Sequence, residues 1–166
     1  MGVSTLALPL VTIQDVIDAI AELGRTLHRE ERAKELIQHI REARQQVRQL
    51  ARQQKRQPTV MIVYGFKPLV VAGPGSFAAE LLADTGATNV AHKATSAYPA
   101  YSLERAVALK PDVIVDCSDA NEGREETMAL LSASRWVRPN SRALLQPSPE
   151  LAEGLWELQR AVNPEK

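Results

Sequence analysis

Residues 60–64, Val-Met-Ile-Val-Tyr, form a continuous apolar run, which is typical of a strand buried on both faces of a parallel sheet. A second short run at 69–72 follows, and a Gly-Pro-Gly-Ser turn at 73–76 leads into a stretch predicted as a helix over 77–85. The serine of that turn can cap the helix, and Gly86 can end it in a left-handed conformation. Strand and helix therefore begin to alternate at this point.

The alternation continues toward the end of the sequence. Further strands are predicted over 88–91, 113–117 and 142–145, and further helices over 102–109, over 122–132 and from Ser148 and Pro149 to about Val162. This order is typical of an α/β three-layer sandwich, here with a short and mostly parallel sheet.

Two helices are predicted before the first strand. Thr12 and Asp15 form a capping box for a helix that begins at Ile13 and that Gly24 can stop. A long helix is predicted over 30–54 from an apolar stripe at helical spacing, made of Ala33, Leu36, Ile37, Ile40, Ala43, Val47, Leu50 and Ala51. We therefore expect an N-terminal helical region at 1–28, a linker helix at 29–57 and an α/β lobe at 58–166.

The composition is that of a soluble globular protein, because 45% of the 166 residues are hydrophobic and 24% are charged. Lys plus Arg and Asp plus Glu each number 20, and this zero net charge disfavours a nucleic-acid partner. No apolar run reaches the roughly 18 residues of a membrane span, and residues 1–11 lack the features of a signal peptide. One basic strip is interpreted as the solvated flank of the long helix: Arg41, Arg44, Arg48, Arg52 and Lys55.

Residues with catalytic or metal-binding chemistry are few. Cys117 is the only cysteine, which excludes an internal disulfide, and we interpret it as a buried structural residue rather than a nucleophile. His28, His39 and His92 do not share the spacing of metal ligands. We therefore predict no metal site, no catalytic residue and no cofactor, and hence a protein that is not an enzyme.

The turn at Gly73–Ser76 supports an alternative, because Gly-Pro-Gly-Ser-Phe-Ala fits the G-x-G-x-x-A pattern of dinucleotide sites. Pro74 removes one backbone donor that a pyrophosphate would use, and no acidic residue ends a strand about 20 residues later. A stand-alone nucleotide-binding or enzymatic α/β domain therefore stays open as the second interpretation.

The few aromatic residues gather where predicted strands end. Tyr64 and Phe66 end the first strand, Tyr98 and Tyr101 flank a proline, and Trp136 follows a helix. Ligands of open α/β sheets bind at the carboxyl ends of the strands, and aromatic faces suit a flat macrocycle. Ordinary packing at the rim of the core is the competing interpretation for Tyr64 and Trp136.

Several segments agree with one family in order and spacing: 68–77, 83–91, 98–104 and 110–115. Together with the long helix before them, they resemble the periplasmic cobalamin and ferric-siderophore binding proteins, whose two α/β lobes are joined by one rigid helix. The resemblance extends from Thr12 onward. It implies a protein that captures a metal chelate outside the cytoplasm and delivers it to the permease of an ABC importer.

The resemblance also implies roles for residues of this sequence. Glu104 matches the glutamate that docks onto an arginine pocket of the permease, although a first-turn glutamate is also favoured by the helix dipole. Tyr98 matches an aromatic ligand contact. The remaining ligand-contact candidates lie on loops or strand ends expected to face the cleft: Phe66, Lys67, Tyr101, Asp119 and Trp136.

The sequence also departs from the family pattern. It starts near the crossover into the linker helix, so we expect only the C-terminal lobe of a two-lobed receptor, and it is short after Trp136. A linker helix without its second lobe is expected to expose apolar surface and to favour self-association. A receptor for free zinc or manganese is a further alternative, disfavoured by the lack of convergent histidines.

Overall fold

The computed structural model describes residues 6–140, 142–144 and 146–164. Its strands form one six-stranded sheet in the order β4-β2-β1-β5-β6, with β3 also paired to β1. The strands are β1 (Thr59–Phe66), β2 (Leu69–Val71), β3 (Thr88–Asn89), β4 (Ala100–Tyr101), β5 (Val113–Asp116) and β6 (Arg135–Val137). The α-helices are α1 (Ile13–Thr26), α2 (Glu30–Arg52), α3 (Phe77–Asp84), α4 (Leu103–Leu109), α5 (Arg124–Leu130) and α6 (Leu151–Val162).

The sheet is mixed, and a ligand site is expected at the carboxyl ends of its parallel strands. β1 pairs in parallel with β3 and β5, and β5 pairs in parallel with β6. The pairs β1–β2 and β2–β4 are antiparallel, because β2 returns directly from β1 through a tight hairpin. The predicted α/β class is confirmed, and the carboxyl ends of β1, β5 and β6 share one edge.

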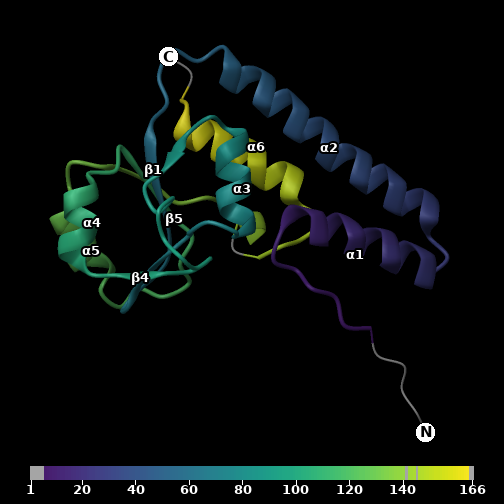
Figure 1. Ribbon diagram of the computed structural model, residues 1–166, viewed down its shortest axis with the longest axis horizontal. Helices are drawn as coiled ribbons and strands as arrows, with labels where there is room; N and C mark the ends of the chain where they lie inside the picture. The colour runs from purple at the N-terminus through teal and green to yellow at the C-terminus, as the bar shows by residue number, and fades with distance from the viewer. Residues whose placement is uncertain (1–5, 141, 145, 165–166) are drawn as a thin grey trace, which may run out of the picture.

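Helices cover both faces of the sheet, as Figure 1 shows with α4 and α5 on one side and α3, α6 and α2 on the other. The alternation of β1 side chains divides the core accordingly. Val60 and Ile62 join the larger cluster beneath α2, α3 and α6, whereas Met61 and Val63 join the smaller cluster beneath α4 and α5. This arrangement confirms the three-layer sandwich.

The apolar stripe of α2 packs against the chain's own helices. Ala33, Ile40, Ala43 and Val47 are buried, because α1, α3 and α6 all contact α2. The expectation that this helix leaves its stripe exposed is therefore wrong for these four residues, whereas Leu50 of the same stripe is exposed. Self-association stays a prediction, with less apolar surface on this helix to support it.

Part of the basic strip on α2 also has a structural role. Arg44 Nε and Arg48 Nε donate to the carboxylate of Asp84 at 2.5 and 2.6 Å. Asp84 is buried at the end of α3, so the two arginines fasten α2 to the lobe. The interpretation of the strip as a solvated flank is wrong for these two side chains.

The helix ends agree in part with the predictions. The capping box of Thr12 and Asp15 and the cap at Ser76 are both formed. Gly24, however, does not stop α1; it lies inside the helix, where a Cβ atom would come within 2.5 Å of the Ala33 Cβ. Glycine is needed there because α1 and α2 approach each other closely.

Two predictions near the end of the sequence are wrong. Residues 142–144 form a 3₁₀ turn instead of a strand, and Leu145 lies outside the described residues. The last strand is β6, at Arg135–Val137. The predicted start of the last helix, at Ser148 and Pro149, is the second error, because α6 begins at Leu151. Before the helix, the Ser148 hydroxyl accepts a hydrogen bond from the Glu150 amide. Among the described helices, none is long and apolar enough to cross a bilayer.

Candidate functional site

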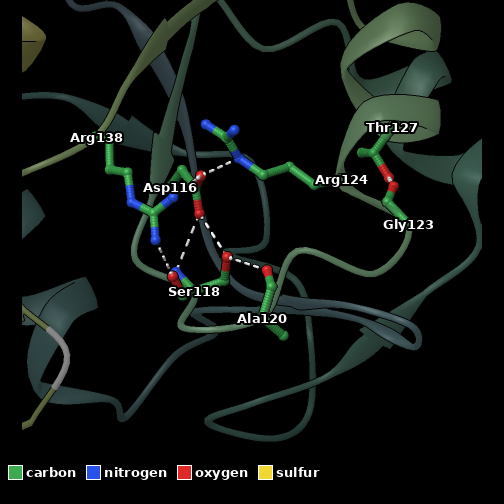
Figure 2. A network of polar contacts seen from close by, with 7 residues as sticks. All are labelled: Asp116, Ser118, Ala120, Gly123, Arg124, Thr127 and Arg138. Carbon is green, nitrogen blue, oxygen red and sulfur yellow. Dashed lines mark hydrogen bonds and ion pairs between the residues drawn. The ribbon is translucent and has the colours of Figure 1, made fainter.

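The candidate site lies where β1, β5 and β6 end. Because parallel strands place their carboxyl ends at the same edge, residues that follow these strands meet there. Asp116 ends β5, Ser118 follows it, and Arg138 follows β6. Arg124 reaches the same place from the first turn of α5, and Figure 2 shows the four side chains together.

Asp116 is the centre of this network. Its carboxylate is 1% exposed. Oδ1 accepts hydrogen bonds from the Ser118 amide at 3.0 Å and from the Ser118 hydroxyl at 2.7 Å. Oδ2 accepts from Arg124 Nε at 2.7 Å. The buried charge is thus satisfied by the protein itself, so Asp116 organises the edge and does not face a ligand.

Arg138 is bound less tightly than Arg124. Its Nη2 donates to the carbonyl of Ser118 at 2.9 Å, and its Nη1 lies 3.9 Å from Asp116 Oδ2. The side chain of Arg138 is 47% exposed, compared with 28% for Arg124. The network therefore places a half-exposed guanidinium at the strand ends, with its charge only partly compensated.

Two tyrosines adjoin this edge at the end of β1. The rings of Tyr64 and Tyr98 pack edge to face, with centroids 5.4 Å apart. The Tyr64 hydroxyl donates to the Leu144 carbonyl at 2.7 Å, whereas Tyr98 is 44% exposed. Burial raises the pKa of both phenols above the ordinary value, so both are neutral at physiological pH. Of the two, Tyr98 is the one accessible to solvent.

Cys117 lies between the tyrosines and the arginine. Burial and the nearby Asp116 carboxylate raise the pKa of its thiol to about 12, although Arg138 opposes the shift. A buried thiol of this pKa is protonated at neutral pH and is not a nucleophile. Cys117 is buried, as predicted.

The structure does not bring all the predicted ligand contacts together. The rings of Phe66 and Trp136 pack against each other at 6.2 Å, in the cluster beneath α4 and α5. Tyr101 is buried in the same cluster and has the Arg105 guanidinium 3.8 Å above its ring. Phe66 and Tyr101 are buried and Trp136 is half-buried, so all three side chains take part in the packing of this cluster.

Lys67 and Asp119 do lie in exposed loops near the strand ends. Lys67 lines an open depression of about 520 Å³ together with Arg124, Glu125 and Glu126. Its ammonium is also 3.9 Å from the Glu122 carboxylate. Two cations and two carboxylates therefore line this depression, and Glu122 adds a third carboxylate beside Lys67.

Glu104 is exposed in the first turn of α4, the helix that follows the carboxyl end of β4. The pKa of its carboxyl is lowered by a hydrogen bond from its own amide and by the Ser102 hydroxyl. The side chain is accordingly an anion on an outer surface. That is the state required to pair with an arginine of another protein.

The turn at Gly73–Ser76 is crowded at its first glycine, whereas the space beside Gly75 is open. A Cβ atom on Gly73 would lie 2.2 Å from the Ser96 carbonyl oxygen and 2.8 Å from Pro99, so another loop of the chain fills the space. Ser76 Oγ donates to the Gly73 carbonyl at 2.8 Å. Likewise, within the described residues, no group of three or more His, Cys, Asp and Glu side chains could hold a metal ion.

Comparison with known proteins gives a consistent result. The family model described as "Periplasmic binding protein" matches residues 2–130. The high-affinity heme uptake system protein IsdE of Staphylococcus aureus (strain Newman) is 30% identical over 98 residues, which are 58% of this chain and 34% of that protein. The match thus spans about a third of the relative's length.

Solved structures agree in fold. An ABC transporter substrate-binding protein from Listeria monocytogenes EGD-e gives a TM-score of 0.79 at 20% identity, covering 95% of this chain and 67% of that one. The vitamin B12 binding protein BtuF of Vibrio cholerae gives 0.76 at 19% identity, covering 97% and 65%. A periplasmic heme binding protein from Pseudomonas aeruginosa gives 0.76 at 23% identity, covering 94% and 62%. At these identities the likeness establishes the fold alone.

Proposed function

This chain belongs to the periplasmic binding protein family, and from that membership we propose that it is the ligand-capturing part of an ABC importer for a metal chelate. The role is non-catalytic: the chain binds the chelate outside the cytoplasm and presents it to a permease. The relatives are named for different ligands, haem in Staphylococcus aureus and vitamin B12 in Vibrio cholerae. A ferric siderophore is the third ligand of this type that the sequence suggests.

The observation that carries the proposal is the edge formed by β1, β5 and β6. It combines a half-exposed aromatic ring, Tyr98, with a half-exposed guanidinium, Arg138. Binding sites for large planar ligands use this pairing, with apolar contact for the ring system and a few polar groups that fix its orientation. A chelate brings its own metal ligands, so the site needs no cluster of metal-ligating side chains.

Tyr98 provides the test of this proposal. We expect Tyr98→Ala to weaken binding of the preferred chelate by about tenfold, because a ring in stacking contact contributes on the order of 1 kcal/mol. Isothermal titration of haemin, cyanocobalamin and a ferric siderophore into the purified full chain measures this. The matched control is Leu130→Ala, which removes a similarly exposed apolar side chain from α5.

Two results would count against the proposal. The first is a folded protein, by circular dichroism, that binds none of the three chelates. The second is equal binding by the wild-type protein and Tyr98→Ala, which would place the ligand elsewhere on the chain.

Glu104 is proposed as the contact with the permease. Its carboxyl is exposed and ionised, and it takes part in none of the contacts around Asp116, Arg124 and Arg138. We expect Glu104→Gln to weaken binding to the detergent-solubilised permease by about tenfold, as loss of one charge-assisted pair does. Glu126→Gln, in the first turn of α5, is the matched control. Equal binding by both variants would remove Glu104 from this role.

A further inference from the structure

A further depression lies at the amino ends of the parallel strands, opposite the edge that carries Tyr98 and Arg138. Its volume is about 800 Å³, and it is bordered by the end of α2, the starts of β1, β5 and β6 and the end of α6. Figure 1 shows the end of α2, the start of β1 and the end of α6 together at the top of the view. The proposed receptor function uses only the other end of the sheet.

Cations outnumber carboxylates around this depression. Its floor consists of buried apolar side chains: Pro58, Val113 and Val162. Its rim consists of exposed basic side chains: Lys55, Arg56 and Arg135. Asp112 is the single carboxylate among the described residues that line it, and Arg56 and Thr59 donate to its two oxygens. Lys55 has no ion pair or hydrogen bond with any described residue.

The neighbouring segments add cations and few carboxylates. No Asp or Glu occurs in residues 43–79 or 127–149, which include the last turns of α2 and all of β1 and β6. Asp84, at the end of α3, is buried between Arg44 and Arg48. Glu157 of α6 contributes to the raised pKa of Cys117 and so lies toward the carboxyl end of β5. Three more exposed cations flank the rim: Arg52, Lys110 and Arg160.

Two helix ends offset part of this positive charge. Helices α2 and α6 both end at the depression, and the carboxyl end of a helix carries roughly half a negative charge. Arg135 donates to the Ala161 carbonyl in the last turn of α6, so part of its charge serves that helix. Together with Asp112, the two helix ends offset about two of the three cations on the rim. The remaining rim cation and the three flanking ones leave this surface positive.

We propose that this end of the molecule, the amino-end surface, binds anionic phospholipid, so that the protein can lie on a bilayer. The surface is defined by the three rim cations and the three flanking cations named above. The depression is open, so a small anion there would stay largely hydrated and would be held weakly. A lipid surface instead presents many phosphates at once, and each Lys or Arg near it contributes roughly 1 kcal/mol.

The orientation on the bilayer follows from the direction of the strands. The amino and carboxyl ends of β1, β5 and β6 lie at opposite edges of the sheet. A protein that contacts lipid through its amino-end surface therefore keeps Tyr98 and Arg138 in solvent. The inference does not depend on the proposed function, although a receptor held on the bilayer in this way would remain near a permease with its ligand edge open.

Flotation of the purified full chain with lipid vesicles tests the inference. The vesicles consist of phosphatidylcholine alone or of equal parts of phosphatidylcholine and phosphatidylglycerol. We expect the protein to float only with the anionic vesicles, and to be released in roughly 1 M NaCl, where the Debye length is about 3 Å. Lys55→Gln combined with Arg135→Gln is expected to weaken binding about thirtyfold, because each cation contributes roughly 1 kcal/mol.

The matched control removes two exposed cations from other parts of the surface. Arg41→Gln combined with Lys93→Gln changes the middle of α2 and the loop after β3, and it is expected to bind like the wild-type protein. Arg135→Gln also removes a hydrogen bond to α6, so Lys55→Glu serves as a second variant. Lys55 contacts no described polar partner, and reversal of its charge is expected to weaken binding without a change in the circular dichroism spectrum.

Three results would overturn the proposal. The first is a folded protein that does not float with the anionic vesicles. The second is an equal loss of binding in the control and in the double variant of the rim, which would indicate a general charge effect. The third is complete release by glycerol phosphate at the same phosphate concentration as the vesicles, which would indicate a site for a small anion.

Discussion

Strand β5 has an aspartate at each end, and the two aspartates have different surroundings. Asp112 precedes the strand and accepts hydrogen bonds from the Thr59 amide at 2.8 Å, from the Thr59 hydroxyl at 2.9 Å and from Arg56. Asp116 ends the strand and binds Ser118 and Arg124. Both carboxylates are fully hydrogen-bonded, but only the second is buried, with 1% of its side chain exposed compared with 33% for Asp112.

The difference shows how one strand serves both folding and recognition. At the amino end of β5, the contacts of Asp112 join this strand to the start of β1. There one arginine, Arg56, pairs with one carboxylate, that of Asp112. At the carboxyl end, the buried Asp116 holds one arginine closely and leaves a second one half exposed. The more exposed of the two arginines around Asp116 thus lies at the edge at which ligands of α/β sheets bind.

The largest loss of stability predicted from this comparison is for a change at Asp116. We expect Asp116→Asn to lower the free energy of unfolding by about 3 kcal/mol, because it removes the charge partner of a largely buried arginine. Urea denaturation followed by circular dichroism measures the change, with the midpoint as the readout. Arg138→Gln is the control, and it is expected to cost less than about 1 kcal/mol because its partner contact is longer and half exposed.

The opposite order of the two stability losses would contradict this account of the carboxyl end of β5. A wild-type midpoint in Asp116→Asn together with a large loss in Arg138→Gln would mean that Arg138, and not Arg124, compensates the buried charge. The guanidinium of Arg138 would then be the main partner of Asp116 and would not be available to a ligand.

The sequence predicted the elements whose signal is local. The apolar run at 60–64 and the cap at Ser76 specify β1 and α3 within a few residues, and both are present as expected. The strands β4 and β6 were missed because they are two and three residues long and lack a clear alternation. Such short edge strands form because a neighbouring strand offers hydrogen bonds, which a single sequence does not display.

The candidate site was predicted less well, for a related reason. Tyr98 was identified, but Arg124 and Arg138 were not, since they lie 8 residues from Asp116 and 20 from Ser118 in the sequence and meet only at the folded edge. Arg138 follows β6, a strand that was itself missed, so no local signal in the sequence marked this arginine. Phe66, Tyr101 and Trp136 stay predictions as ligand contacts, although all three pack in the core cluster beneath α4 and α5, because an aromatic residue beside a strand end fits core packing equally well.

A smaller contribution to stability is predicted for Asp112, at the amino end of β5. The Thr59 amide, the Thr59 hydroxyl and Arg56 lower the pKa of the Asp112 carboxyl, and partial burial opposes them. A carboxyl whose pKa is lower in the folded state stabilises the protein when ionised. Its contribution is therefore complete above about pH 4, the ordinary pKa of an unfolded aspartate, and is lost as the pH falls through the lower folded value.

We expect Asp112→Asn to cost about 1 kcal/mol at pH 7, less than Asp116→Asn, because one third of the Asp112 side chain is exposed to screening solvent. The gap between wild-type and variant proteins is expected to narrow as the pH falls from 4 toward 2, as urea denaturation at several pH values would show. Glu126→Gln, an exposed carboxylate-to-amide change on α5, is expected to show neither effect. A gap for Asp112→Asn that stays constant with pH would mean that the hydrogen-bond geometry, and not the charge, holds the amino end of β5, and the contrast between its two ends would then rest on burial alone.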